Sequence, residues 1–162
     1  MSQTEEFQEE EQEDPVVVLR ELLEEVVDSL GLDADVHVEQ ADGVLTGSVE
    51  GDDLGLFIGR RGQTIDAVQH LAQRIVFHGG APEARVVIDA DGYRERREET
   101  LRSLAAEAAE ESLRSGEAVE LDPMPASERR IVHEYLRERG GVQTHSEGDE
   151  PERYLVVEPG EG

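Results

Sequence analysis

The stretch Leu56-Phe57-Ile58-Gly59-Arg60-Arg61-Gly62-Gln63-Thr64-Ile65 decides the fold of the first half of this chain. Two glycines bracket two arginines, between a short apolar segment and a longer amphipathic one. Glycine adopts positive φ easily and lets the backbone approach a ligand closely. Gly62 lies just before an expected helix over residues 63–78, whose free N–H groups and dipole attract phosphate. The stretch therefore predicts a turn between two helices, which either binds an anion or simply exposes two arginines.

Two other phosphate-binding loops are excluded by spacing. A P-loop needs a lysine after its second glycine, and this chain contains no lysine at all. A dinucleotide-binding fingerprint needs three glycines at fixed intervals between a strand and a helix, and that spacing is absent.

Hydrophobic periodicity extends the prediction outward from this turn. Asp14-Pro15 is typical of a helix start, and Gly31 of a helix end. Alternating residues predict strands over 36–38, 44–49 and 85–89. Together with a short helix over 52–58 and the helix over 63–78, ended by Gly79-Gly80-Ala81-Pro82, the first half has the order α-β-β-α-α-β.

The second half predicts the order α-β-α-β-β. A long polar helix runs from Asp91-Gly92 to about Ser115, and another helix ends at Gly140. The strands are expected over 118–121, 142–144 and 153–157. We therefore predict an α+β protein of two small domains, residues 15–91 and 92–159, the second including the long connecting helix.

Composition narrows the function classes. The chain has 162 residues, no cysteine and a formal charge of −25, which excludes disulfides, thiol catalysis and cysteine-ligated zinc. Residues 1–14 carry seven acids and no base, so we expect a disordered acidic tail. The five histidines have no metal-site spacing, and no nucleophile elbow is present. With no signal peptide or membrane-spanning segment visible, we expect a cytoplasmic binding protein that is not an enzyme and has no cofactor or metal.

The helix expected after Pro125 carries a basic arc beside its apolar stripe. With Arg129 as origin, His133 lies about 40° around the helix, Arg137 about 80° and Arg130 about 100°. The apolar residues cluster on the other side. Arg129 and His133 are four residues apart, so both side chains could reach one phosphate; a partly buried histidine on a surface helix is the equal alternative.

Two known domains resemble these patterns. Residues 56–69 resemble the glycine-bracketed loop of type II KH domains, in which a helix and a strand precede the β-α-α-β unit. Residues from Pro123 to Arg153, with the pair Arg129 and His133, resemble the R-three-H domain. The two in this order resemble the Jag (SpoIIIJ-associated) family of bacterial RNA-binding proteins, many of which carry a further N-terminal domain where this chain has a 14-residue acidic tail.

The resemblance implies single-stranded RNA, or single-stranded DNA, as the ligand. It implies a post-transcriptional role linked to cell-envelope growth, without membrane insertion. The expected protein partner is a small KH-only protein or a second copy of the chain. Ile58, Ile65 and Val68 would border an apolar groove for bases, or else belong to the core. The expected RNA-binding residues are Ile58, Gly59, Arg60, Arg61, Gly62, Gln63, Ile65, Arg129, Arg130, His133, Arg137 and Arg153.

Charge distribution is compatible with two local RNA sites. Residues 59–97 contain seven arginines and five acids, and residues 123–145 contain four arginines and three acids. Residues 1–58 contain 18 acids and one arginine, a field that repels nucleic acid. The alternative function is a protein–protein scaffold that uses both folds and the acidic tail without binding nucleic acid.

Overall fold

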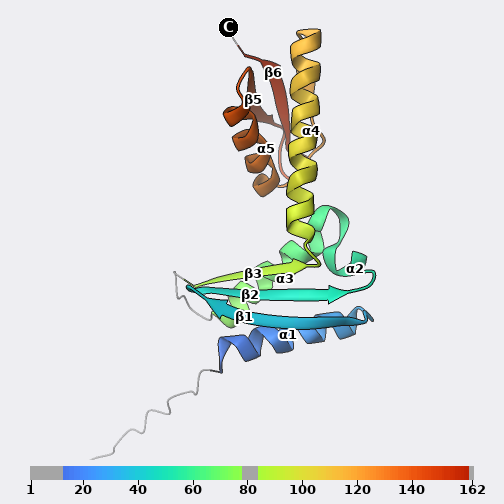
Figure 1. The fold of residues 1–162 in the computed structure, drawn as a ribbon, viewed down its shortest axis with the longest axis vertical. Coiled ribbons are helices and arrows are strands. Elements are labelled where there is room, and N and C mark those ends of the chain that lie inside the picture. The colour runs from blue at the N-terminus through green and yellow to red at the C-terminus, as the bar shows by residue number, and fades with distance from the viewer. Residues whose placement is uncertain (1–12, 78–83, 161–162) are drawn as a thin grey trace, which may run out of the picture. The chain divides into compact units, whose positions relative to one another are not determined.

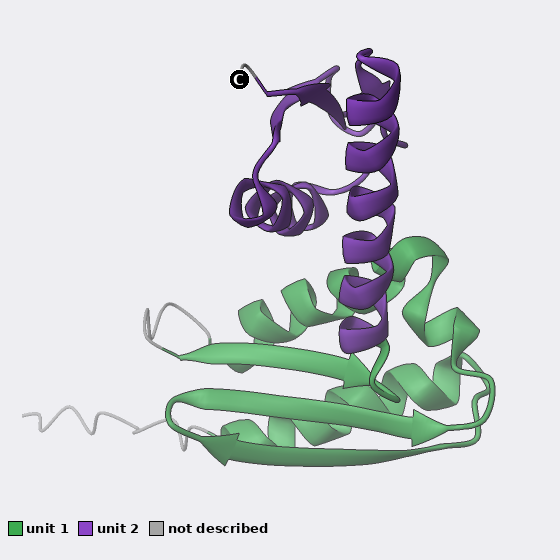
Figure 2. Ribbon diagram, turned by 45° about the horizontal axis from the view of Figure 1, so that its top comes forward, with its two compact units in different colours: residues 1–93 green, residues 94–162 purple. Residues whose placement is uncertain are grey.

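The computed structural model of the chain describes residues 13–77 and 84–160 (Figure 1). Two compact units make up the chain, Met1–Tyr93 and Arg94–Gly162 (Figure 2). The predicted α+β class and both element orders are confirmed. Residues 1–12 of the expected acidic tail lie outside the described residues, and so does the helix break expected at 79–82.

The first unit is a three-stranded sheet covered on one face by two helices. The elements are α1 (Pro15–Ser29), β1 (Ala34–Ala41), β2 (Val44–Gly51), α2 (Gly55–Ile58), a 3-10 turn η1 (Arg60–Gly62), α3 (Gln63–Val76) and β3 (Arg85–Ala90). β2 is central, antiparallel to β1 and parallel to β3. Its inward residues Leu45 and Val49 have no exposed surface, because α1 and α3 pack on that face.

The start of α1 follows the sequence prediction. The Asp14 carboxylate accepts a hydrogen bond from the Val16 N–H at 2.9 Å, and Pro15 occupies the first turn. The helix then lies directly on β2. A Cβ at Gly47 would stand only 2.6 Å from Cδ1 of Leu23, so glycine at this position allows the helix and the sheet to approach.

The second unit packs two helices on one face of a second three-stranded sheet. Its elements are α4 (Tyr93–Ser115), whose first residue belongs to the first unit, β4 (Val119–Glu120), α5 (Ala126–Arg139), β5 (Val142–Glu147) and β6 (Tyr154–Pro159). β6 is central and antiparallel to both neighbours. Small residues of α4 are buried against the rest of the core, namely Ala105, Ala108 and Ala109.

In this second sheet, two strand predictions were too short and one was too long. β5 continues to Glu147 because Ser146 pairs with Leu155 and Glu147 with Tyr154 across the hairpin. β6 likewise extends to Pro159, which pairs with Val142. β4 is limited to the two residues that pair with Val156 and Val157 of β6. Strand ends depend on cross-strand pairing, which alternation within one strand does not reveal.

Candidate nucleic-acid interface

The glycine-bracketed turn, residues 59–62, connects α2 to α3. Gly59 has φ 73° and Gly62 has φ 77°, both in the region that favours glycine. A Cβ at Gly59 would clash with Thr64, approaching its backbone N to 2.8 Å. Hydrogen bonds from the Gly59 N–H to the Gly55 carbonyl (2.8 Å) and from the Gly62 N–H to the Gly59 carbonyl (3.2 Å) hold the turn. The chain therefore reverses sharply, and Thr64 occupies the space where a side chain at position 59 would lie.

The two arginines of the turn differ in setting. Arg60 is exposed, and among the described residues it has no ion-pair partner. Arg61 is half-buried and has φ 53°, an unusual value for a residue other than glycine. Such backbone strain clusters at functional sites. The turn thus offers one cation fully to solvent and holds the second in a constrained conformation.

The N-terminus of α3 is open to an anion. Its N-cap residue is Gly62, which has no side chain to accept a hydrogen bond from the first-turn amides. Gln63, the first helical residue, is exposed. The Gln63 N–H donates to the Arg60 carbonyl. First-turn N–H groups without a side-chain cap and the positive end of the helix dipole lie beside Arg60 and Arg61, as phosphate binding requires.

The apolar groove expected beside this turn is smaller than the sequence suggested. Ile65 has no exposed surface and Val68 is 8% exposed, so both belong to the core of the first unit. Ile65 is therefore a core residue next to the turn and has no exposed surface for a base to contact. Ile58 is half-buried and keeps a surface next to Gly59.

Two glutamines of α3 bind the outer edge of β3, which sequence analysis did not anticipate. The Gln73 amide accepts a hydrogen bond from the Val86 N–H (2.7 Å) and donates one to the Ala84 carbonyl (3.0 Å). Gln69 accepts from the Ile88 N–H at 2.9 Å. Gln69 and Gln73 are four residues apart, which is about one turn of a helix, and Val86 and Ile88 are two residues apart, which is one repeat of a strand. Successive glutamines on α3 therefore reach successive N–H groups along the edge of β3. This arrangement fixes α3, and with it the turn at its start, against the sheet.

In the second unit, Arg129 is a buried structural residue. Its exposed fraction is 8%, and it donates hydrogen bonds to the Met124 carbonyl (2.8 Å) and the Glu150 carboxylate (2.5 Å). The prediction that Arg129 lies on an exposed arc is wrong, because the segments around Met124 and Glu150 cover that side of α5. The Arg129 hydrogen bond is the main cause that lowers the pKa of Glu150.

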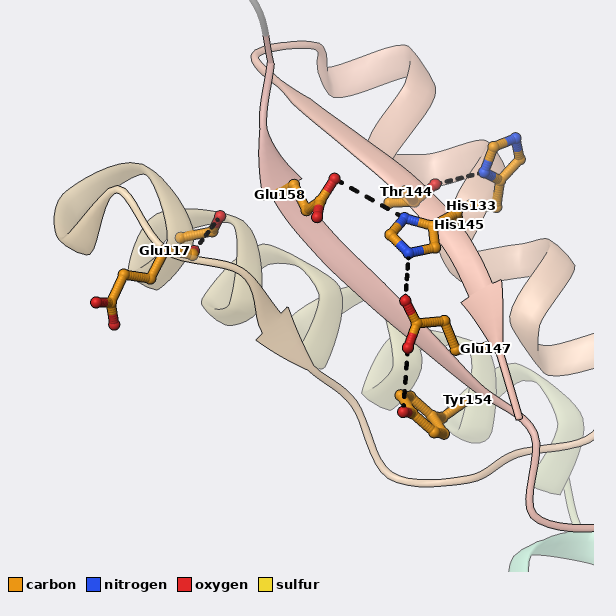
Figure 3. Close-up of polar contacts among 8 residues, drawn as sticks. Glu117, His133, Thr144, His145, Glu147, Tyr154 and Glu158 are labelled. Carbon is orange, nitrogen blue, oxygen red and sulfur yellow. Dashed lines mark hydrogen bonds and ion pairs between the residues drawn. The ribbon is translucent and has the colours of Figure 1, made fainter.

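His133 is exposed, which excludes the partly buried alternative, and it touches the neighbouring strand. Its Nδ1 lies 2.5 Å from Oγ1 of Thr144 on β5 (Figure 3). A shallow hollow of about 380 Å³ opens here between α5 and β5. Its lining residues are Ala126, Arg129, Arg130, His133, Thr144, His145, Ser146 and Leu155. The structure thus places residues of α5 and residues of β5 beside one hollow, and both sets belong to the segment that resembles the R-three-H domain.

The remaining predicted arginines have different surroundings. Arg130 is exposed and forms an ion pair with Glu134 at 2.8 Å; this hydrogen bond is the first cause of the lowered pKa of Glu134. Arg137 is exposed on the same helix. Arg153 donates to the Gly148 carbonyl at 2.9 Å, so it holds the β5–β6 turn together. Arg130 therefore lines the hollow and Arg137 remains on the surface of α5, whereas Arg153 is engaged in the turn.

Two further polar groups were missed by sequence reasoning. Glu128 is 8% exposed and accepts two hydrogen bonds from Arg97, at 2.8 and 2.9 Å, so it ties α5 to α4. His145 pairs with Glu147 (2.8 Å) and lies 3.9 Å from Glu158 (Figure 3). The His145 hydrogen bond is the main cause that lowers the pKa of Glu147. The Arg97–Glu128 and His145–Glu158 pairs join residues that only helix packing or strand pairing brings together. His145 and Glu147, in contrast, are two residues apart in the sequence.

Two kinds of feature are not found within residues 13–77 and 84–160. No group of three metal-ligating side chains gathers there. No helix in these ranges has both the length and the apolar content needed to cross a bilayer.

Comparisons with known proteins agree with both units. Residues 17–88 match the family model for the KH domain of KhpA/KhpB, and residues 99–159 match the model for the R-three-H domain. "RNA-binding protein KhpB" of Clostridium symbiosum is 39% identical over 85% of this chain and 63% of its own length. The protein of that name from Lactiplantibacillus plantarum is 43% identical over 90% of this chain and 45% of its own.

A third relative is covered more completely. "RNA-binding protein KhpB" of Bacillus subtilis is 32% identical over 89% of this chain and 70% of its own length. The chain spans about half to two thirds of the first two relatives. With two domain models in the expected order and these relatives, the chain belongs to the KhpB family, also known as the Jag family, whose members join a KH domain to an R-three-H domain.

Proposed function

We propose that this chain binds single-stranded RNA through two sites, one in each unit. The observation that carries the proposal is the turn at residues 59–62, where the exposed Arg60 stands beside the uncapped N-terminus of α3. KH loops of this kind clamp the backbone of about four nucleotides. The family relatives are named RNA-binding proteins, which supports the same ligand.

The second proposed site is the hollow between α5 and β5. His133 and Arg130 supply its polar and cationic surface, and the buried Arg129 also lines it. Hydrogen bonds from a histidine ring and charge from exposed arginines suit phosphate rather than a specific base. The two sites are proposed to act on one cytoplasmic RNA as a post-transcriptional regulator. A role in envelope growth and a KH-only partner rest on the family resemblance.

The proposal is tested by the salt dependence of RNA binding. The parent protein should retain a pool of random single-stranded RNA, and double-stranded RNA much less, since KH loops take unpaired strands. Two phosphate contacts at the turn alone give a slope of log K against log salt of about −1.4. Affinity should then fall at least sevenfold, roughly, between about 50 and 200 mM salt. Binding that is absent at about 50 mM salt contradicts the proposal and favours the scaffold function.

The second site is tested by His133→Ala. The side chain is exposed, so the free energy of unfolding should change by no more than about 0.5 kcal/mol. RNA affinity should fall a few-fold. The loss is measured with the same pool of single-stranded RNA at about 50 mM salt.

The matched control is His145→Ala. His145 pairs with Glu147, so its removal should lower RNA affinity less than the removal of His133. An RNA affinity that falls in His145→Ala but not in His133→Ala would contradict the role of His133. A large fall in melting temperature for His133→Ala would contradict the surface role.

A further inference from the structure

Gly62 lies against the ring of Tyr93. A Cβ at Gly62 would stand 2.9 Å from Cε1 and 3.0 Å from Oη of that ring. Gly62 is buried, and Tyr93 packs against the core of the first unit. The second glycine of the turn is therefore limited by its neighbour as well as by its φ. No larger residue fits at that position unless the ring moves.

Two other positive-φ glycines, Gly31 and Gly116, lack such a neighbour. Gly31 has φ 68° and Gly116 has φ 73°, and neither has a heavy atom within 4 Å of an added Cβ. Their need for glycine is conformational alone. Gly62 differs, because an aromatic ring occupies the space where a side chain would be.

We propose that Tyr93 is a positioning residue for the RNA-binding turn, an inference that rests on the proposed function. The ring forms a rigid surface under Gly62, the residue that caps α3. Backbone hydrogen bonds across the turn run from the Gly62 N–H to the Gly59 carbonyl at 3.2 Å and from the Gln63 N–H to the Arg60 carbonyl. Glycine backbone has wide conformational freedom. Contact with the ring restricts that freedom and keeps Arg60 and the α3 amides in a binding arrangement before RNA arrives, which lowers the ordering cost of binding.

Tyr93 is also the first residue of α4. The residue that supports the turn is thus the start of the helix whose later turns form the core of the second unit. Tyr93 therefore contacts the turn although it lies outside residues 17–88, the segment that matches the KH domain model.

The first experiment measures the turn itself, without RNA. Amide hydrogen exchange at Gly62 and Gln63, followed by NMR, should accelerate at least tenfold, roughly, in Tyr93→Ala, because opening of the turn becomes easier. Exchange in the β1–β2 ladder should stay as in the parent. Tyr93→Phe keeps the ring and should retain slow exchange. Unchanged exchange at Gly62 and Gln63 in a folded Tyr93→Ala protein would overturn the inference.

The second experiment measures RNA binding with the same variants. Affinity for single-stranded RNA should fall roughly tenfold in Tyr93→Ala and stay within about twofold of the parent in Tyr93→Phe. Gly62→Ala should bind at least as weakly as Tyr93→Ala, whereas the matched control Gly31→Ala should bind like the parent. In the double variant that combines Tyr93→Ala with Gly62→Ala, the loss of binding free energy should be smaller than the sum of the two single losses, since both changes act on one contact.

The outcomes separate this inference from the proposed function. Faster exchange with unchanged RNA affinity would support the contact and overturn its role in binding. A parent protein that does not bind RNA contradicts the proposed function, and the exchange measurement then decides the structural part alone. If Tyr93→Ala does not fold, the comparison of Gly62→Ala with Gly31→Ala carries the test, and equal behaviour of these two overturns the inference.

Discussion

Replacing both Arg60 and Arg61 by aspartate is expected to reduce RNA affinity by about a hundredfold at roughly 0.1 M salt. Two phosphate contacts are lost, and two carboxylates then stand beside the N-terminus of α3, where they compete with phosphate for its free N–H groups. The slope of log K against log salt should become shallower by about 1.4, since each lost contact with a single strand removes about 0.7.

The fold should survive this double change. Aspartate tolerates positive φ better than most residues, and in this chain Asp42, Asp53 and Asp91 adopt φ between 48° and 54°. The backbone at position 61, with φ 53°, is therefore compatible with aspartate. Thermal melting should show a change of only a few degrees.

A control with the same change in net charge separates the local site from the overall field. Arg102 and Arg114 are exposed on α4, where they pair with Glu98 and Glu111. Replacing both by aspartate alters the total charge equally but leaves the turn intact, so RNA affinity should fall only a few-fold. Equal losses in the two double variants would contradict the assignment of the turn as the RNA site.

Replacing Arg129 by alanine is expected to destabilise the second unit by about 1–3 kcal/mol. The side chain is 8% exposed and donates to the Met124 carbonyl and to Glu150. Met124 is itself 4% exposed, so its carbonyl would lose a partner in a buried position. For a unit of this size, the melting temperature should fall by roughly 10 °C.

Arg130→Ala is the matched control for this change. Arg130 is adjacent in sequence, but its side chain is 78% exposed and pairs with Glu134 on the surface, so its loss should cost no more than about 0.5 kcal/mol. A melting temperature for Arg129→Ala equal to that of Arg130→Ala would contradict the buried role. RNA affinity of Arg129→Ala is meaningful only below its melting transition.

The effect of Arg129→Ala should also depend on pH. The Arg129 hydrogen bond lowers the pKa of Glu150 below its ordinary value of 4.5. A carboxyl group whose pKa is lower in the folded state stabilises the fold above its unfolded pKa, and this contribution is lost as the pH falls through the folded value. The difference in stability between the parent and Arg129→Ala should therefore narrow below about pH 4.5.

Local patterns in the sequence were sufficient for the architecture. Periodicity placed the helices, and the glycines at 59 and 62 located the turn, because φ preference and amphipathicity are properties of neighbouring residues. The pair Arg129 and His133 was found for the same reason, since both lie on one helix. The family resemblance then joined these separate observations.

Contacts between distant segments were not accessible in the same way. The angular position of Arg129 on α5 indicated an exposed residue, but the loop at Met124 and the turn at Glu150 cover that side. Angles on a helix describe its faces and not the loops that return over them. The Glu128–Arg97 pair and the Gly62–Tyr93 contact join segments about 30 residues apart, and no local pattern marks either.

The glutamine contacts of α3 have a consequence for self-association. β3 is an edge strand, and an unpaired edge is a template on which strands of other molecules add and aggregate. Gln69 and Gln73 occupy the outward N–H groups of Val86 and Ile88, so that edge is already closed to a further strand. The opposite edge, β1, exposes Asp35, His37 and Glu39, and acidic side chains on an edge discourage such pairing. The first unit is thus protected at both borders of its sheet against growth into larger β-assemblies, by amide groups on one side and by negative charge on the other.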